Sequence, residues 1–178
     1  MTAANFEQCL RWLLESEGGN DDDPLDHGGR TSRGITQREY DAYRDREDLP
    51  RGDVWKATDA EVKQIYHDSY WKPYCDDLPT GIDYLFFDMS VLQGLHKAVQ
   101  ILQRGLGVKD DGHIGIVTRT ALSEQSTIDR LNLISRITQK RIRFFQSLRQ
   151  PRFTKGWLHR AHSVENLALA LYRGTSPI

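Results

Sequence analysis

Apolar side chains near the start of the chain follow the i, i+3, i+4, i+7, i+8 spacing of one helix face. They are Phe6, Cys9, Leu10, Leu13 and Leu14. We expect this helix to end at Glu17-Gly18-Gly19, because consecutive glycines disfavour a helix. Residues 18–34 contain five glycines, one proline and four aspartates, which predicts a loop or hairpin.

The rest of the pattern predicts further helices. Thr36 to Glu39 and Thr58 to Glu61 both fit the S/T-x-x-E capping box that opens a helix. After a break at 78–81, apolar positions continue to residue 106 at helical spacing, and two later helices are expected at 131–148 and 157–172. Strand-like alternation is scarce, so we expect a mainly α fold with a small loop or hairpin region after the first helix.

Composition places the chain among globular proteins. With 178 residues, 38% of them hydrophobic and 28% charged, the chain is large enough for one domain or two small ones. We expect segments 1–80 and 81–178 to pack into one compact unit. The sequence has no run of 18 apolar residues that would predict a membrane span, and we recognise no signal peptide in it. Cys9 and Cys75 are expected to be buried thiols.

Charge is distributed unevenly along the chain. Residues 1–100 contain 11 Lys or Arg and 20 Asp or Glu, whereas residues 101–178 contain 13 and five. A basic cluster within 126–160 suggests attraction to a polyanion, with cell wall, nucleic acid and simple solvation as competing explanations. Its members are Arg130, Arg136, Lys140, Arg141, Arg143, Arg149, Arg152, Lys155 and Arg160.

Glu17 has the setting of a general acid. Cleaving a glycosidic bond needs a carboxyl group that stays protonated and donates its proton to the leaving oxygen. At a helix end, apolar neighbours and the negative end of the helix dipole would raise the pKa of Glu17. Asp26 follows nine residues later as a candidate base or charge stabiliser, and Thr31 and Thr36 offer hydroxyls that can position water. The same spacing also fits an acid that is merely solvated.

The motifs around these residues resemble a known enzyme family. Glu17-Gly18-Gly19, Asp23-Pro24, Gly28-Gly29-Arg30-Thr31 and Gly34-Ile35-Thr36-Gln37 are similar to the N-terminal signature of glycoside hydrolase family 108. The resemblance implies a lysozyme-like α-helical fold, N-acetylmuramidase activity and Glu17 as the catalytic acid. Gln37, inside the motif, is expected to contact substrate. Asn20 stands where the motif usually has Tyr, a change expected to affect the wall of the cleft.

Two further resemblances concern the other candidate residues. Phage-type lysozymes share the order Glu, Asp, Thr, which supports Asp26 and Thr31 as catalytic by looser analogy. Residues 85–122 resemble the peptidoglycan-binding domain that commonly follows this catalytic segment, and Asp111 to Gly115 are expected to form a tight turn.

Tyr70 and Trp71 are candidates for stacking on sugar faces, although core packing explains aromatic residues at this spacing equally well.

Metal and cofactor sites are not expected. His159 and His162 lie three residues apart without a third ligand at suitable spacing. Asp21, Asp22, Asp23 and Asp26 lack the alternation and the closing Glu of a calcium loop. We therefore predict no metal and no cofactor.

The sequence as a whole predicts a hydrolase of the β-1,4 bond between N-acetylmuramic acid and N-acetylglucosamine. Its partner would be bacterial peptidoglycan, not nucleic acid. We expect a monomer that is made in the cytoplasm and acts on the cell wall, with a holin or a secretion apparatus for delivery. Three alternatives remain open. They are a non-catalytic wall-binding module, a lytic transglycosylase and a basic nucleic-acid-binding protein.

Overall fold

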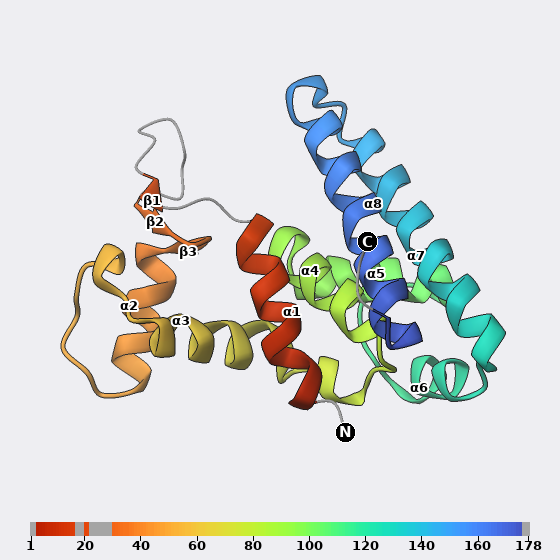
Figure 1. Cartoon of the computed structure of the whole chain (residues 1–178), viewed down its shortest axis with the longest axis horizontal. Helices are drawn as coiled ribbons and strands as arrows, with labels where there is room; N and C mark the ends of the chain where they lie inside the picture. Colours follow the sequence, from red (N-terminus) through yellow and green to blue (C-terminus); the bar gives the residue numbers. More distant parts are fainter. Residues whose placement is uncertain (1–2, 17–19, 22–29, 176–178) are drawn as a thin grey trace. The chain divides into compact units, whose positions relative to one another are not determined.

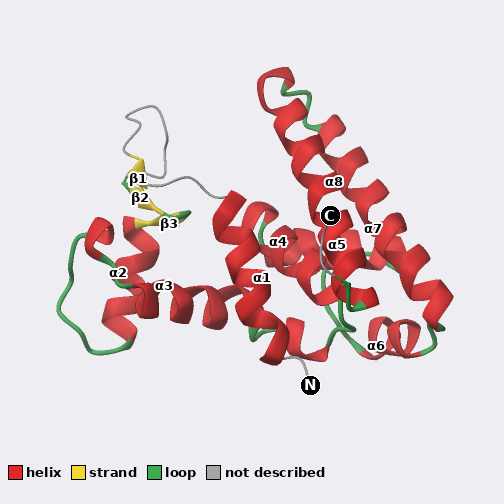
Figure 2. Cartoon of the chain, in the orientation of Figure 1, coloured by secondary structure: helices red, strands yellow, loops and turns green. Residues whose placement is uncertain are grey.

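Helices dominate the computed structural model, which describes residues 3–16, 20–21 and 30–175 (Figures 1 and 2). The expected mainly α fold with a small hairpin region after the first helix is confirmed. Contacts divide the chain into two compact units: a hairpin unit, Phe6–Pro73, and a helical unit that combines Met1–Asn5 with Tyr74–Ile178. The expected single compact unit with a boundary near residue 80 stays a prediction.

The hairpin unit contains short strands between helices. In chain order its elements are α1 (Ala3–Ser16, which begins in the other unit), β1 (Asn20–Asp21), β2 (Thr31–Ser32), β3 (Ile35–Thr36), α2 (Gln37–Arg46), the 3-10 turn η1 (Val54–Lys56), α3 (Asp59–Tyr66) and the π-helical turn η2 (His67–Trp71). The strands form an antiparallel sheet in the order β1-β2-β3. The apolar face expected for α1 is confirmed, since Phe6, Cys9, Leu10 and Leu13 are buried.

Both predicted capping boxes are present. The Thr36 hydroxyl accepts from the Glu39 amide at 3.2 Å, while the Glu39 carboxylate accepts from the Thr36 amide at 2.9 Å. Thr58 and Glu61 repeat the arrangement at 3.3 and 2.9 Å. These reciprocal bonds satisfy amide groups that a helix start leaves open, so the local sequence fixes where α2 and α3 begin.

The helical unit is built around α4. Its elements are η3 (Cys75–Asp77), α4 (Ile82–Gln93), α5 (Leu95–Leu106), α6 (Ile116–Ser123), α7 (Thr127–Ser147) and α8 (Pro151–Arg173). α4 is buried along most of its length and packs against α5, α7 and α8, and α7 and α8 run side by side (Figure 1). Gly81 precedes α4 with φ of +84°, and a Cβ there would meet the Ala168 carbonyl oxygen at 2.6 Å. Glycine is therefore required at this position.

A charged cluster lies inside the helical unit. Asp88 of α4 is fully buried and accepts from Arg141 at 2.5 Å and from Arg160 at 2.9 Å. Burial lowers the pKa of the Arg141 guanidinium, which is also fully buried. Arg141 is therefore not available to attract a polyanion, unlike what was expected of the basic cluster within 126–160. Two basic residues of that segment neutralise Asp88.

The expected turn from Asp111 to Gly115 is confirmed at its centre. Gly112 has φ of +79°, and the buried Gln103 side chain accepts from the Gly112 amide and donates to Asp111 and His113. Both Cys9 and Cys75 are buried, as predicted. Within the described ranges, no helix is long and apolar enough to cross a membrane.

Candidate active site

The structure describes some of the expected catalytic and substrate-binding residues and leaves others out. Glu17 and Asp26 lie outside the described residues. Thr31, Gln37, Tyr70 and Trp71 are described, and all belong to the hairpin unit. The geometry of the site therefore comes from the second half of the motif and from what packs around it.

Thr31 occupies the central strand of the sheet. It pairs with Asp21 of β1 on one side and with Thr36 of β3 on the other. The Thr31 side chain is half-buried, and its hydroxyl has no hydrogen-bond partner among the described residues. The Thr36 hydroxyl, by contrast, is used in the capping box of α2. Of the two hydroxyls expected to position water, only that of Thr31 is available in the described structure.

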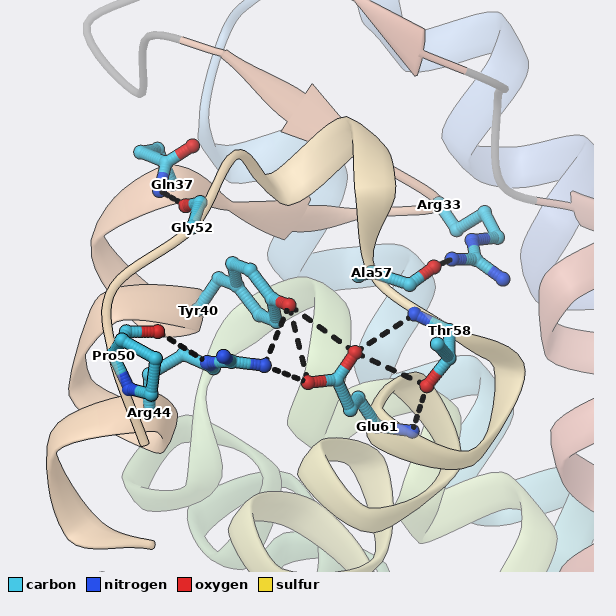
Figure 3. Close-up of polar contacts among 9 residues, drawn as sticks. All are labelled: Arg33, Gln37, Tyr40, Arg44, Pro50, Gly52, Ala57, Thr58 and Glu61. Atoms are coloured by element: carbon cyan, nitrogen blue, oxygen red, sulfur yellow. Dashed lines mark hydrogen bonds and ion pairs between the residues drawn. The ribbon is translucent and has the colours of Figure 1, made fainter. Parts of the chain in front are cut away.

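The Gln37 side chain connects α2 to the segment that follows it. Its amide nitrogen donates to Asp41 and to the Gly52 carbonyl, both at 2.8 Å, and its oxygen accepts from the Val54 amide at 2.9 Å (Figure 3 shows the bond to Gly52). The bonds to Gly52 and Val54 hold residues 52–54 beside the start of α2. A direct contact between Gln37 and substrate stays a prediction.

Tyr70 and Trp71 lie on the π-helical turn η2, a geometry often found near functional sites. The Tyr70 hydroxyl donates to Glu39 at 2.6 Å. Trp71 is fully buried, and its ring lies 5.3 Å from that of Phe6, as in an ordinary core contact. Sugar stacking by these two residues stays a prediction, and Tyr70 is the more exposed of the pair.

Trp55 is a surface aromatic residue beside Thr31 that is not among the site residues expected from the sequence. Its indole N–H donates to the Thr31 carbonyl at 3.0 Å, and 37% of its surface is exposed. The Arg30 guanidinium lies 4.2 Å from the ring centre and pairs with Asp53 at 3.0 Å. Asp53 also caps η1 by accepting from the Trp55 amide. Only the Gly-Asp dipeptide before Val54 and Trp55 hints at this turn in the sequence.

A carboxylate network fixes the base of the hairpin unit (Figure 3). Glu61 accepts from Tyr40 at 3.1 Å and from Arg44 at 2.5 Å, in addition to its capping bonds with Thr58. Burial raises the pKa of Glu61, but hydrogen bonds from Thr58, Arg44 and Tyr40 outweigh it and lower the pKa overall. Glu61 is therefore an ionised structural group and lacks the proton that a general acid must donate.

Charged residues also hold the turn between β2 and β3. Arg33 has φ of +51°, and its carbonyl accepts from the Tyr66 hydroxyl at 2.7 Å. Its guanidinium pairs with Asp59 at 2.5 Å and donates to the Ala57 carbonyl. The hairpin that presents Thr31 is thus attached to α3 through Arg33.

Comparison with known proteins identifies the class as a lysozyme-like glycoside hydrolase. The Glycosyl hydrolase 108 family profile matches residues 10–94, and the profile described as Predicted Peptidoglycan domain matches residues 97–162. SagA from Brucella abortus has a similar solved structure, with a TM-score of 0.80 and 30% identity over 96% of this chain and 97% of that chain. No curated protein matches.

The chain belongs to the Glycosyl hydrolase 108 family. It is a peptidoglycan hydrolase of the N-acetylmuramidase type, with a peptidoglycan-binding domain in its C-terminal half. The expected enzyme class and the expected partner, peptidoglycan, are confirmed.

Proposed function

We propose that Glu17 is the general acid that protonates the glycosidic oxygen between N-acetylmuramic acid and N-acetylglucosamine. The observation that carries the proposal is the available Thr31 hydroxyl on the central strand of the sheet. Glu17 follows Ser16, the last residue of α1, and precedes Asn20 of β1 by three positions. Asn20 pairs with Ser32, the neighbour of Thr31.

Asp26 and Thr31 complete the proposed mechanism. Asp26 belongs to the connection between β1 and β2 in the sequence, which begins at Asp21 and ends at Thr31, two residues that pair with each other. The Asp26 carboxylate would accept a proton from water, or stabilise the positive charge that develops on the sugar. The Thr31 hydroxyl would hold that water in place. The product is inverted if Asp26 activates water and retained if a carboxylate attacks the sugar.

Trp55 is proposed to contact a sugar ring next to this site. An indole offers a flat apolar face, and sugars present apolar C–H groups on one face of the ring. The bond from the Trp55 indole to the Thr31 carbonyl holds the aromatic ring at a fixed position beside the central strand. Arg30 covers part of the ring and keeps it oriented.

Mass spectrometry of the products tests this mechanism. Purified sacculi digested with the protein should release muropeptides with reducing N-acetylmuramic acid ends, because water attacks the sugar. Products with 1,6-anhydromuramic ends would identify a lytic transglycosylase, in which Asp26 has no role as a base. Sacculi that bind the protein and remain intact would favour a non-catalytic binding module.

Three finer expectations remain predictions. They are a monomeric state, the absence of a metal or cofactor requirement, and synthesis in the cytoplasm with delivery to the wall through a holin or a secretion apparatus. Size-exclusion chromatography with light scattering tests the first, and activity in the presence of a chelator tests the second.

A further inference from the structure

A pocket of about 440 Å³ lies within the helical unit. One side is formed by residues 74–79, the segment that includes η3 and precedes α4. The other side comes from Ile114, α6 and the first turn of α7. The volume falls within the range of small-ligand sites, with room for a few amino-acid residues. The pocket spans both family matches, because residues 74–79 precede the peptidoglycan domain profile.

The pocket combines an apolar surface with charged groups. Leu78 and Leu122 are buried lining residues. Arg119 of α6 pairs with Asp77 of η3 at 2.7 Å, and the two side chains are 49% and 62% exposed. This ion pair links the two sides of the pocket and neutralises Arg119. Asp76 adds a further carboxylate to the lining.

Arg130 is the other cation that lines the pocket, and no ion pair like that of Arg119 with Asp77 is seen for it among the described residues. It lies in the first turn of α7, and its Nε is buried without a hydrogen-bond partner among the described residues. Burial keeps this Nε out of reach of a molecule in the pocket, so a ligand would meet Arg130, a lining residue, through its other guanidinium nitrogens. The planar fork of a guanidinium matches the two oxygens of a carboxylate. The pocket is therefore suited to a carboxylate on a small, partly apolar molecule.

We propose that this pocket binds the stem peptide of peptidoglycan, with a peptide carboxylate on Arg130. Stem peptides carry free carboxylates, methyl side chains and the ammonium group of a diamino acid. These groups complement Arg130, the Leu78 and Leu122 surface, and the acidic residues of η3 in turn. The inference rests on the action of the chain on peptidoglycan. The inference adds that the hairpin unit acts on the glycan while the helical unit holds the peptide.

Binding two parts of one polymer raises the effective concentration of the enzyme at the wall. Cleavage of sacculi should therefore depend on the stem peptide more strongly than cleavage of short soluble glycans does. A carboxylate on the glycan itself, the lactyl group of muramic acid, is the competing source of the same chemistry, and the test separates the two.

Calorimetric titration of the full chain tests the proposal with ligands that the enzyme cannot cleave further. The probes are the free tetrapeptide L-Ala-γ-D-Glu-diaminopimelate-D-Ala, the same peptide with amidated carboxylates, and the peptide-free disaccharide. The free tetrapeptide should bind, while amidation should weaken binding at least about tenfold. Binding of the disaccharide at an affinity equal to that of the peptide, with the same response to variants, would assign the pocket to the glycan and overturn the proposal.

Arg130→Gln and Ser123→Phe are the informative variants. Arg130→Gln should weaken tetrapeptide binding at least about tenfold, whereas Arg143→Gln, the same change at a position of α7 outside the pocket, should change it less than about twofold. Ser123→Phe fills the pocket from an exposed position and alters no charge, so it decides the matter if Arg130→Gln unfolds.

Tetrapeptide affinity that is equal in the wild type, Arg130→Gln and Ser123→Phe would overturn the proposal, as would no peptide binding to the wild type at millimolar concentration. These results do not depend on cleavage. Failure of the pocket and failure of Glu17 as the acid are therefore distinguished.

Discussion

Replacing Asp83 with asparagine should remove a pH dependence from the stability of the helical unit. Asp83 is buried at the start of α4, where its carboxylate accepts from the Gly81 and Tyr84 amides, both at 2.7 Å, and from the Asn5 side chain at 2.8 Å. Burial raises the pKa of Asp83 to about 6 from an ordinary value of 3.8, because the hydrogen bonds only partly offset desolvation.

The sign and size of the effect follow from this pKa. The folded state holds the Asp83 proton more tightly than the unfolded state. The contribution of this group to the free energy of unfolding is therefore fully present below pH 3.8 and is lost as the pH rises through about 6. The full shift corresponds to about 3 kcal/mol. Between about pH 4.5 and pH 7.5 the linkage relation gives a loss of about 2 kcal/mol. Glu61 and Asp68 have lowered pKa values and act in the opposite direction, so the variant must be compared with the wild type at each pH.

Urea unfolding of the wild type and Asp83→Asn at several pH values measures this difference. The introduced carboxamide keeps an oxygen for the two backbone amides, and Asn5 can rotate its own amide to accept from the new NH₂ group. The free energy of unfolding of the wild type minus that of the variant should fall by about 2 kcal/mol between about pH 4.5 and pH 7.5. Parallel curves for the two proteins would refute the reasoning, because Asp83 would then have the same pKa in both states.

Two further substitutions test the site and the core. Trp55→Ala should lower kcat/KM on sacculi at least about fivefold, mainly through KM, because a sugar-contacting face is lost, whereas Trp55→Phe should retain most of the activity; equal kcat/KM for the wild type and the alanine variant would exclude the contact. Asp88→Asn should lower the free energy of unfolding by about 3–5 kcal/mol, because the buried Arg141 loses its counter-ion, and a loss below about 1 kcal/mol in urea titration would contradict this account.

Local signals in the sequence predicted the parts of the fold that depend on neighbouring residues. The capping boxes of Thr36 and Thr58 and the apolar face of α1 each involve positions within one or two helical turns. The turn at Gly112 was predicted for the same reason, since a positive φ is a property of one residue and its neighbours.

Contacts between distant residues were not predictable in this way. Arg141 is part of the basic cluster expected from the sequence, but its partner Asp88 lies 53 positions away. Trp55 was missed because its importance comes from Thr31, 24 positions earlier. The Arg130 pocket also depends on residues 74–79, which are far away along the chain. The proposed catalytic roles of Glu17 and Asp26 come from the motif alone.

The loss of turbidity of purified sacculi, measured with the wild type, Glu17→Gln and Glu15→Gln, tests the central claim most directly. Glu17→Gln keeps the shape of the side chain and removes the proton that is donated, so the initial rate should fall at least about a hundredfold. Glu15→Gln makes the same change at an exposed residue of α1 and should leave the rate within about twofold of the wild type. Equal rates for Glu17→Gln and the wild type would contradict the account and place the catalytic acid at another residue.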